Sequence, residues 1–351
     1  MPARAYDAIV VGASFAGLAV ARQLRGEVLL LDRNEVGALQ TSACGTPLWV
    51  AEALGVAGSV LQVHDHLTLD LAGRSVRYDL SAVPFCTFDH RAFCRGLLGQ
   101  TRARFLRTGV LGLQDGAVTT EAGRFTAPVV VDCSGWRAAL VGSGAPARGR
   151  GYSFGLESRT ATTGEGLGFF IDRGVIPQGL GWVFPVGDAT LIGLGSYVGR
   201  SRLRGALGRY LARDGTPPGP YHGTYFPNRP RAATRGRVFA VGDAAGQCLP
   251  LTAEGIRPAL YFGSECGRLL QQVLDGRRTL ESALGAYRRL VDRHAGAYRA
   301  LAAMEWLTAR APMAILGAVA ALAQRRSVRR RWWPRYGCFG QAGALAAPIP
   351  A

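Results

Sequence analysis

The sequence has no lysine, and each of its 41 basic residues is an arginine. This absence excludes every mechanism that depends on an ammonium group, such as a Schiff-base lysine or the lysine of a phosphate-binding P-loop. Acidic residues number only 24, so the formal net charge is +17. Such a charge favours an anionic substrate, an anionic membrane surface or nucleic acid as a partner. The arginines lie on no recognisable nucleic-acid-reading module, so we expect no nucleic-acid partner.

Cysteine and histidine form no pattern that is typical of a metal site. The seven cysteines are scattered and include no CxxC pair, which argues against a zinc site or a disulfide framework and predicts reduced thiols in the cytoplasm. His64 and His66 alternate on a predicted strand, but no third ligand lies near them in the sequence, so we predict no metal. A strand begins almost at the first residue, so we expect no signal peptide.

The sequence also lacks an apolar run long enough to cross a bilayer. Residues 311–323 are apolar without interruption, but a transmembrane helix needs about 20 such residues. A basic cluster with Trp332, Trp333 and Tyr336 follows, an order similar to that of an interfacial anchor. The alternative to such a membrane anchor is a helix in the protein core, followed by a solvated tail. We therefore expect a cytoplasmic protein, with peripheral contact to the anionic inner face of the membrane left open.

The N-terminal segment contains a glycine-rich turn between two apolar strands. Strands are predicted over residues 8–11 and 28–31, with a helix over about 16–24 between them. The turn has the spacing of a dinucleotide-binding loop, with serine where the second glycine is usual. A tight turn, close backbone approach to a pyrophosphate and helix–strand packing each need a small residue, and an acid after the second strand can bind ribose hydroxyls. The predicted cofactor contacts here are Gly12, Ser14, Ala16, Gly17, Asp32 and Arg33.

A second segment of the same type covers residues 238–263, VFAVGDAAGQCLPLTAEGIRPALYFG. The pattern predicts a strand, a Gly-Asp turn, a proline-containing loop and a helix. Asp243 can bind a hydroxyl group or reach a phosphate through water. The free N–H groups at the start of the helix can stabilise a negative charge, and Gly255 permits close backbone approach.

The order of these motifs resembles the flavoprotein family that includes p-hydroxybenzoate hydroxylase, the flavin halogenases and the geranylgeranyl reductases. The resemblance covers most of residues 5–270 and is closest to the geranylgeranyl reductase type. SACGTP contains Cys44 and Gly45 where these reductases have a Cys-Gly pair near the flavin. GLGWVFP is similar to their YxWxFP motif, with Leu180 in place of the aromatic residue. GDAAGQCLPLTAEGI is similar to their GDAAG…P.TGEGI segment.

The resemblance implies an α/β fold in which a Rossmann-like FAD-binding domain carries an inserted antiparallel β-sheet substrate domain and a C-terminal helical region. Locally, the sequence predicts a β-hairpin over residues 60–80, a helix over 89–98 and a connector over 216–230, a stretch that contains five prolines. The expected domains are FAD-binding parts at 1–59, 85–150 and 231–275, a substrate domain at 60–84 and 151–230, and a helical region with a basic aromatic tail at 276–351.

The resemblance also implies site residues around an FAD. Trp182 and Phe184 would form a wall of the substrate cavity, although both are also compatible with plain β-sheet packing. Cys44 would contact the substrate or tune the flavin, with a buried inert thiol as the alternative. Arg91 would contact the flavin, or would be an exposed helix arginine. The predicted catalytic residues are Cys44, Trp182 and Phe184, and the further cofactor contacts are Cys44, Arg91, Gly242, Asp243, Pro250, Glu254, Gly255 and Ile256.

The predicted function is FAD-dependent reduction of C=C bonds in an isoprenoid or lipid-like substrate. Hydride would come from reduced flavin and a proton from Cys44 or a bound water, with NAD(P)H or a small electron carrier as the electron donor. The main alternative is a flavin-dependent monooxygenase acting on an aromatic or carrier-bound metabolite. A halogenase is a weaker alternative: residues 132–135, DCSG, resemble tryptophan halogenases, but the active-site lysine of those enzymes is absent. A third alternative is a flavin-assisted cyclase, but the acidic FLEET-type motif of lycopene cyclases is absent, which argues against it.

Overall fold

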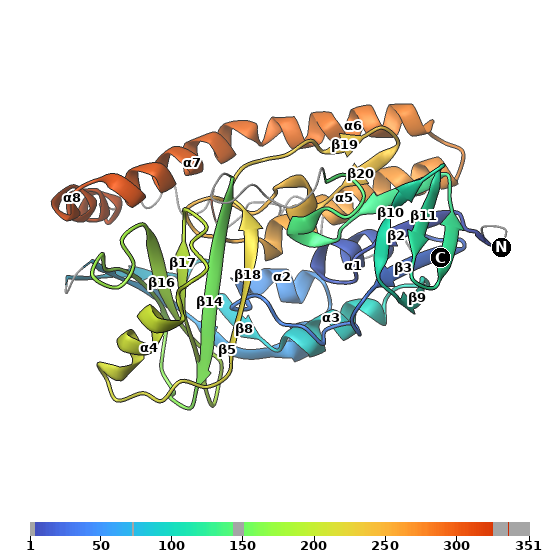
Figure 1. The fold of residues 1–351 in the computed structure, drawn as a ribbon. Coiled ribbons are helices and arrows are strands. Elements are labelled where there is room, and N and C mark those ends of the chain that lie inside the picture. Colours follow the sequence, from blue (N-terminus) through green and yellow to red (C-terminus); the bar gives the residue numbers. More distant parts are fainter. Residues whose placement is uncertain (1–3, 72–73, 143–150, 326–335, 337–351) are drawn as a thin grey trace.

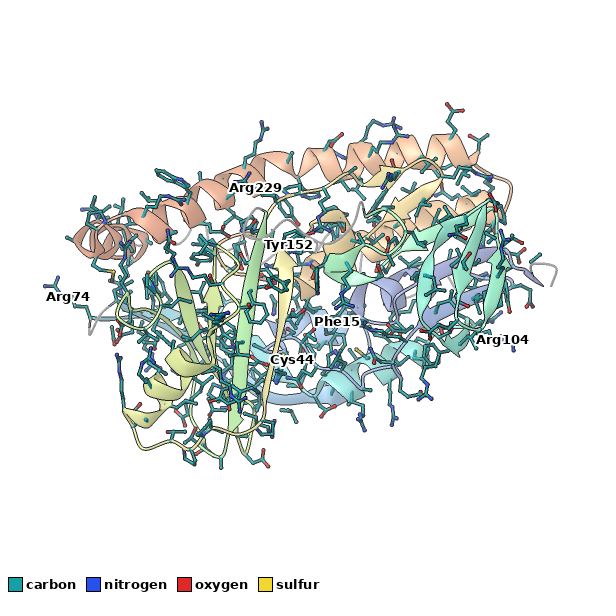
Figure 2. All side chains as sticks on the ribbon, in the orientation of Figure 1. Phe15, Cys44, Arg74, Arg104, Tyr152 and Arg229 are labelled. Atoms are coloured by element: carbon teal, nitrogen blue, oxygen red, sulfur yellow. The ribbon has the colours of Figure 1, made fainter. Side chains whose placement is uncertain are left out.

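The computed structural model describes residues 4–71, 74–142, 151–325 and 336. Residues 72 and 73, within the predicted hairpin, and the basic cluster with Trp332 and Trp333 lie outside these residues. Two sheet-containing lobes lie side by side, and a row of C-terminal helices runs along both of them (Figure 1). Phe15 and Cys44 lie in the interior of the molecule, whereas Arg74 and Arg104 lie at its periphery (Figure 2).

The first lobe is built on a six-stranded sheet with the order β19-β20-β13-β2-β3-β9, parallel except for the β19–β20 pair. Its inner strands are continuously apolar, as expected for strands covered on both faces. A small sheet of order β1-β12-β11-β10 packs on one face of this main sheet. The strands of the two sheets are β2 (Ala8–Val11), β3 (Val28–Asp32), β9 (Arg104–Arg107), β13 (Val129–Asp132), β19 (Thr234–Arg235), β20 (Val238–Ala240), β1 (Arg4–Ala5), β10 (Val110–Gln114), β11 (Ala117–Thr120) and β12 (Gly123–Thr126).

Two helices, α1 (Phe15–Ala21) and α5 (Ile256–Leu274), pack tightly on the other face of the main sheet. Glycine makes this packing possible. A Cβ atom on Gly263 would lie 2.7 Å from the carbonyl oxygen of Ala16, and one on Gly267 would lie 2.7 Å from that of Val20. The two segments that the sequence singles out, far apart in the chain, are therefore held against each other.

The second lobe is a seven-stranded sheet with the order β18-β14-β17-β16-β15-β6-β7. It is antiparallel except for the parallel pairing of β6 with β15. Helix α4 (Arg204–Ala212) packs on one of its faces. The strands are β6 (His66–Leu71), β7 (Ser75–Asp79), β14 (Tyr152–Thr160), β15 (Leu167–Ile171), β16 (Gly179–Pro185), β17 (Thr190–Ser196) and β18 (Tyr221–Pro227).

Two local predictions need correction. Residues 216–230 are not a plain connector, because β18 lies within them and forms the edge of the seven-stranded sheet. An edge strand tolerates flanking prolines, since one side of its backbone needs no ladder partner. The predicted hairpin is confirmed only for the antiparallel β6–β7 pair. Strand β5 (Val60–His64) instead joins a three-stranded sheet of order β4-β8-β5, with β4 (Gly45–Pro47) and β8 (Phe85–Phe88).

The remaining helices connect and cover the lobes. The helix predicted over residues 89–98 is present as α3 (His90–Leu98). Asp89 caps its start, since the Asp89 side chain accepts a hydrogen bond from the Ala92 N–H at 2.6 Å. The other helices are α2 (Leu48–Ala53), α6 (Leu280–Arg293), α7 (Ala295–Arg310) and α8 (Met313–Ala323), with short 3₁₀ turns at Ala57–Ser59, Gly135–Arg137 and Gly242–Ala245. The predicted fold class is confirmed. None of the helices in the described ranges is long and apolar enough to span a membrane.

Candidate active site

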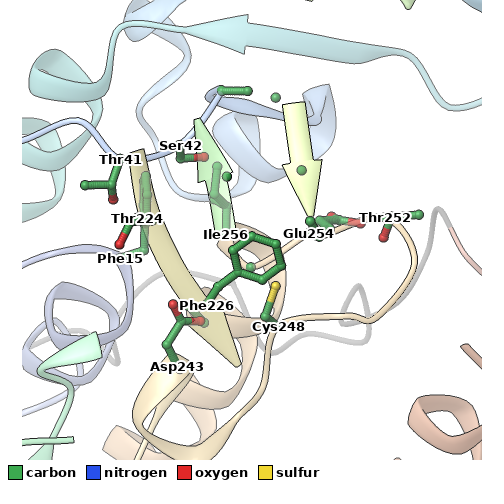
Figure 3. A pocket seen from close by; sticks show the side chains of 18 of the residues that line it. Phe15, Thr41, Ser42, Thr224, Phe226, Asp243, Cys248, Thr252, Glu254 and Ile256 are labelled. Atoms are coloured by element: carbon green, nitrogen blue, oxygen red, sulfur yellow. The ribbon is translucent and has the colours of Figure 1, made fainter. Parts of the chain in front are cut away.

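A cavity of about 1010 Å³ connects the two lobes. Its lining residues come from the glycine-rich turn after β2, the end of β3, the loops at 41–45 and 248–256, the seven-stranded sheet, and α8. This volume lies at the upper end of the range for small-molecule sites. Figure 3 shows part of the cavity wall, with side chains from the loop before β4, from β18 and from the segment before α5.

The glycine-rich turn has the close contacts of a dinucleotide cradle. Gly12 has a φ of +103°, and a Cβ atom there would lie 2.2 Å from the carbonyl oxygen of Cys133. A Cβ on Gly17 would lie 1.7 Å from the Gly12 carbonyl oxygen, so Gly17 serves helix packing and does not line the cavity. The Asp32 carboxylate accepts hydrogen bonds from the N–H groups of Ala13 at 2.8 Å and Asn34 at 2.9 Å. Asp32 therefore holds the turn in place and also lines the cavity beside it.

The second predicted segment faces the same cavity. Gly242 follows β20 with a φ of +67°, and Asp243 lies next to it in the cavity wall. Burial raises the pKa of Asp243 to about 6, and nearby Arg231 opposes the rise. None of the described side chains or backbone groups forms a hydrogen bond with its carboxyl group. A half-buried carboxyl group at the cavity wall suits a ligand hydroxyl group, which is the role that the sequence predicts for Asp243.

The loop before α5 is strained and is held by residues of the other lobe and of α7. Leu251 and Ala253 have φ values of 70° and 54°, a conformation that costs energy for residues other than glycine. The Tyr197 hydroxyl group donates to the Leu251 carbonyl oxygen at 2.8 Å, and the Leu251 N–H donates to Glu305 at 3.1 Å. Burial raises the pKa of Glu305 to about 7. These contacts hold the loop with Gly255 and Ile256 against the cavity.

Glu254 also lines the cavity, but its carboxylate already has protein partners. The fully buried Arg257 donates from Nε and Nη2 to the two Glu254 oxygens, each at 2.7 Å. The Tyr336 hydroxyl group donates to one of the same oxygens at 2.6 Å. Such a paired carboxylate supports the loop and has little capacity left for a cofactor.

Three other predicted residues, Cys44, Arg91 and Pro250, lie outside the cavity wall, so the contacts predicted for them stay predictions. Cys44 is 1% exposed, and its thiol donates to the Ser42 carbonyl oxygen at 3.3 Å. Burial raises the pKa of this thiol well above its usual value, and the negative charge of Glu157 adds to the effect. Arg91 is exposed on α3, and Pro250 is a buried residue of the loop at 248–256. The local motifs could not show which way these side chains point.

The floor of the cavity at the second lobe is a row of residues paired across the strands. The register aligns Glu157 with Gly193, Gly193 with Trp182, and Trp182 with Phe169. Since Gly193 has no side chain, the Trp182 indole ring lies across it, and Trp182 Nε1 donates to Glu157 Oε2 at 2.9 Å. Trp182 and Phe184 both line the cavity, and their contact with a substrate stays a prediction.

His222 extends the row on β18 and was missed by the sequence analysis. It pairs with Glu157 across the strands, and its Nε2 bonds Glu157 Oε1. Glu157 is 3% exposed, whereas the His222 side chain is 26% exposed and lines the cavity. The signal in the sequence was the alternation of His222, Thr224 and Phe226, which places all three on one face of a strand. No three or more His, Cys, Asp or Glu residues within the described ranges form a group that could hold a metal ion.

The far end of the cavity is apolar and reaches the surface beside α8. Val319 and Leu322 line the cavity and are nevertheless 42% and 49% exposed, so they stand at its mouth. The other apolar residues at this end include Leu67, Leu69, Leu71, Phe169, Ile171, Leu180, Leu316, Ala320 and Ala323.

The chain is similar in sequence to parts of two curated reductases. No family model matches it. A digeranylgeranylglycerophospholipid reductase of Methanocaldococcus jannaschii is 29% identical over 145 residues, which cover 36% of this chain and 35% of that protein. A reductase of the same name from Methanospirillum hungatei is 32% identical over 141 residues, covering 34% of this chain and 32% of that protein. The match thus spans about a third of the length of these relatives.

Solved structures match over most of the chain. A geranylgeranyl bacteriochlorophyll reductase-like protein from Thermoplasma acidophilum has a TM-score of 0.79 over 93% of both chains, at 16% identity. A probable FAD-dependent monooxygenase from Pseudomonas aeruginosa has a TM-score of 0.65 at 18% identity, covering 87% of this chain and 96% of that one. A flavin-dependent brominase has a TM-score of 0.70 at 13% identity, covering 93% and 92%. The chain therefore has the fold of FAD-dependent reductases, monooxygenases and halogenases, as its motifs predict.

Proposed function

We propose that the protein is an FAD-dependent oxidoreductase that reduces C=C bonds of an isoprenoid or lipid-like substrate. The observation that carries this proposal is the continuity of one cavity, from a dinucleotide-type turn at one end to an apolar chamber at the other. The names of the two partly matching reductases and of the Thermoplasma structure support the same chemistry.

The residues of the first lobe fit FAD. The turn at Gly12, Ser14 and Ala16 would lie against the pyrophosphate, Asp32 and Arg33 beside the adenosine, and Asp243 beside a hydroxyl group of the ribityl chain. The backbone around Gly255 and Ile256 would face the ring system. Bound FAD would supply the hydride, and the electrons would reach it from NAD(P)H or a small electron carrier.

The chemistry of the chamber favours an apolar substrate. Leucine, isoleucine, phenylalanine and tryptophan side chains form most of its wall on the second lobe, and they exclude water from the reacting bond. Within the described part of that wall, Glu157 and His222 are the one carboxylate–histidine pair. A long hydrocarbon chain could extend past them to the mouth beside α8.

A direct test uses product mass. The purified holoenzyme is kept under nitrogen with dithionite as reductant and a geranylgeranylated glycerophospholipid as substrate. We expect each reduced double bond to add about two mass units, because one hydride and one proton are gained. An unchanged lipid in the presence of fully reduced enzyme would contradict the proposal. Oxygen-dependent addition of about 16 mass units to an aromatic compound would establish the monooxygenase alternative instead.

We also propose that α8 contacts an anionic membrane, from which a lipid could enter the cavity mouth. No charged residue lies within α8, and Ile315, Val319 and Leu322 are 48%, 42% and 49% exposed. Arg310 and Arg325 flank the helix, and the chain carries a net charge of +17. An apolar helix with flanking cations suits the surface of an anionic bilayer.

Vesicle co-sedimentation tests the membrane contact. Phosphatidylglycerol vesicles should pellet the wild type, and Ile315→Asp should reduce the bound fraction several-fold, because a charge would enter the apolar region of the bilayer. Ile315 is not a cavity-lining residue, so activity on detergent-dispersed substrate should persist. Leu111→Asp is the matched control, since Leu111 is 67% exposed in the first lobe. Equal binding by all three proteins would overturn the proposed contact.

A further inference from the structure

We propose that His222 delivers the proton that alkene reduction requires, and that Glu157 and Trp182 are positioning residues that orient it. This inference rests on the proposed function, because an alkene that accepts a hydride at one carbon must gain a proton at the other. None of these three roles follows from the sequence motifs alone.

The hydrogen bonds leave one nitrogen of His222 available. Nε2 bonds Glu157 Oε1, and no group of a described residue forms a hydrogen bond with Nδ1. The side chain is 26% exposed and lines the cavity. The bond to Glu157 fixes the ring orientation and assigns the Nε2 proton, so Nδ1 is the nitrogen that can exchange a proton with a ligand.

The surroundings of Glu157 suit a histidine that becomes positively charged. Glu157 is 3% exposed and accepts from Trp182 through its other oxygen, at 2.9 Å. An imidazolium beside this carboxylate forms a pair with no net charge, which an apolar cavity tolerates far better than an isolated cation. No arginine in the described ranges pairs with either residue.

The pair lies close to the loops that would hold the flavin ring. Glu157 contributes to the raised pKa of Cys44, after burial, so its charge reaches the loop at 41–45. Thr224 and Phe226 lie on the same face of β18 as His222. Figure 3 shows both side chains in one group with Ser42, Asp243, Cys248, Glu254 and Ile256. A substrate bond held against the ring system would therefore lie within reach of the His222 side of the sheet.

Two other candidate donors are less suited to the task. Burial raises the pKa of the Cys44 thiol well above its usual value, and this thiol is bonded to the Ser42 carbonyl oxygen outside the cavity wall. His90, on α3, also lines the cavity, but burial lowers its pKa, and the Gly37 carbonyl oxygen and the charge of Asp89 oppose only part of this effect. Its two nitrogens lie 3.4 Å from the Gly37 carbonyl oxygen and 3.7 Å from the Cys94 sulfur. His90 is therefore less suited than His222 to hold a transferable proton.

The proposed step balances in atoms and electrons. The alkene π bond breaks, one carbon gains a hydride from reduced FAD, and the other gains the proton from His222 Nδ1. Bound FAD would supply the two electrons that travel with the hydride, and the imidazolium would become a neutral imidazole. Water that enters the cavity then returns a proton to Nδ1, while Glu157 keeps its hydrogen bond to Nε2.

The kinetic test is anaerobic single turnover of the dithionite-reduced holoenzyme with a geranylgeranylated lipid. His222→Gln should slow alkene-dependent flavin reoxidation on the order of 100-fold or more, as expected when a general acid is lost. Glu157→Gln keeps the size of the side chain and removes its charge, so we expect a loss of about tenfold and a rate that falls at a lower pH than in the wild type. His66→Gln is the matched control, because His66 is bonded to Asp65 at 2.7 Å outside the cavity. It should behave as the wild type does.

A second readout needs no turnover. Nitrogen NMR spectra of the substrate-free protein should show the Nε2–H of His222 bonded to Glu157, and a pH titration follows the gain of a proton at Nδ1. In Glu157→Gln that protonation should require a lower pH, whereas a purely structural Glu157 would leave it unchanged. Retained FAD and an unchanged circular dichroism spectrum show that each variant is folded.

The outcomes separate the two proposals. An active wild type with an equally active His222→Gln variant would overturn the role of His222 and leave alkene reduction standing. A wild type whose reduced flavin is stable to every isoprenoid lipid would overturn the proposed function, and this proton-donor role with it. The result we expect is an active wild type, an active His66→Gln and a severely slowed, FAD-loaded His222→Gln.

Discussion

At the level of single residues, the absence of side chains at glycines decides where the large side chains of the cavity lie. Gly193 is the clearest case, because a Cβ atom there would lie 2.2 Å from the Trp182 ring and 2.8 Å from the Glu157 Cβ. The indole ring can reach Glu157, two strands away, only across this position. A residue with no functional group thus controls the position of two that have one, Trp182 and Glu157.

Gly193→Ala should displace the Trp182 ring and break its hydrogen bond to Glu157. We expect the free energy of unfolding to fall by about 1–3 kcal/mol, the usual cost of overpacking. Urea denaturation measures this change. Gly58→Ala is the matched control, since a Cβ there would meet nothing within 4 Å, and its effect should stay within about 0.5 kcal/mol. Equal stability of the two variants would show that the Trp182 ring can move at no cost.

Glu305 should make stability depend on pH. Burial raises its pKa from 4.5 to about 7, so the folded protein keeps a proton that the unfolded chain has lost between these values. The resulting stabilisation is fully present below about pH 4.5 and is lost as the pH rises through about 7. The free energy of unfolding of the wild type minus that of Glu305→Gln should therefore fall by roughly 1–3 kcal/mol across this range. A difference that stays flat or rises with pH would contradict this account.

At the level of elements, β18 shows where sequence patterns succeed and where they fail. The glycine-rich turns and the helices after them are local patterns, so the sequence predicts them, and Gly12 and Asp243 indeed face one cavity. The prolines around β18 led to the prediction of a loop, because proline clusters usually indicate loops. Proline is compatible with a strand at the edge of a sheet, which is where β18 lies. Glu157 and His222 meet through strand register across 65 residues, and no local motif encodes that pairing.

The loop before α5 depends on elements from elsewhere in the chain. Tyr197→Phe removes the 2.8 Å hydrogen bond to the Leu251 carbonyl oxygen. One lost bond costs about 0.5–1.5 kcal/mol, so FAD affinity should fall by about two- to tenfold. Titration of the apoprotein with FAD, followed by flavin fluorescence, measures this affinity. Tyr78→Phe is the matched control, because the Tyr78 hydroxyl group bonds the Ala320 carbonyl oxygen on α8. Loss of affinity in both variants, or in neither, would contradict the proposed role of this bond.

At the level of the whole molecule, one cavity lies between two lobes, each of which has its own main sheet. The overall fold could be predicted because its motifs resemble those of known flavoproteins, and structures at 16% and 18% identity share it. The shape of the apolar chamber could not be predicted, since it depends on how α8 packs against β6 and β7. We therefore expect the chamber, more than the glycine-rich turn, to decide which substrates fit.

Ala320→Trp should shorten the chamber, because Ala320 is 6% exposed and lines its α8 end. We expect the rate with a geranylgeranyl chain to fall about tenfold while a geranyl chain reacts as before, since filling the pocket costs about 1–2 kcal/mol for the longer chain only. Ala318→Trp, on the exposed side of the same helix, is the control. Equal losses for both chain lengths would mean that the substrate does not extend toward α8.

The most direct test of the central claim is stopped-flow absorbance under strict nitrogen. The fully reduced flavoprotein is mixed with a geranylgeranylated lipid, and flavin absorbance is followed at intervals before any air enters. The account predicts that the lipid alone restores the oxidised flavin spectrum, with one flavin reoxidised for each double bond lost. A flavin that stays reduced until oxygen is admitted, with the lipid intact, would contradict it.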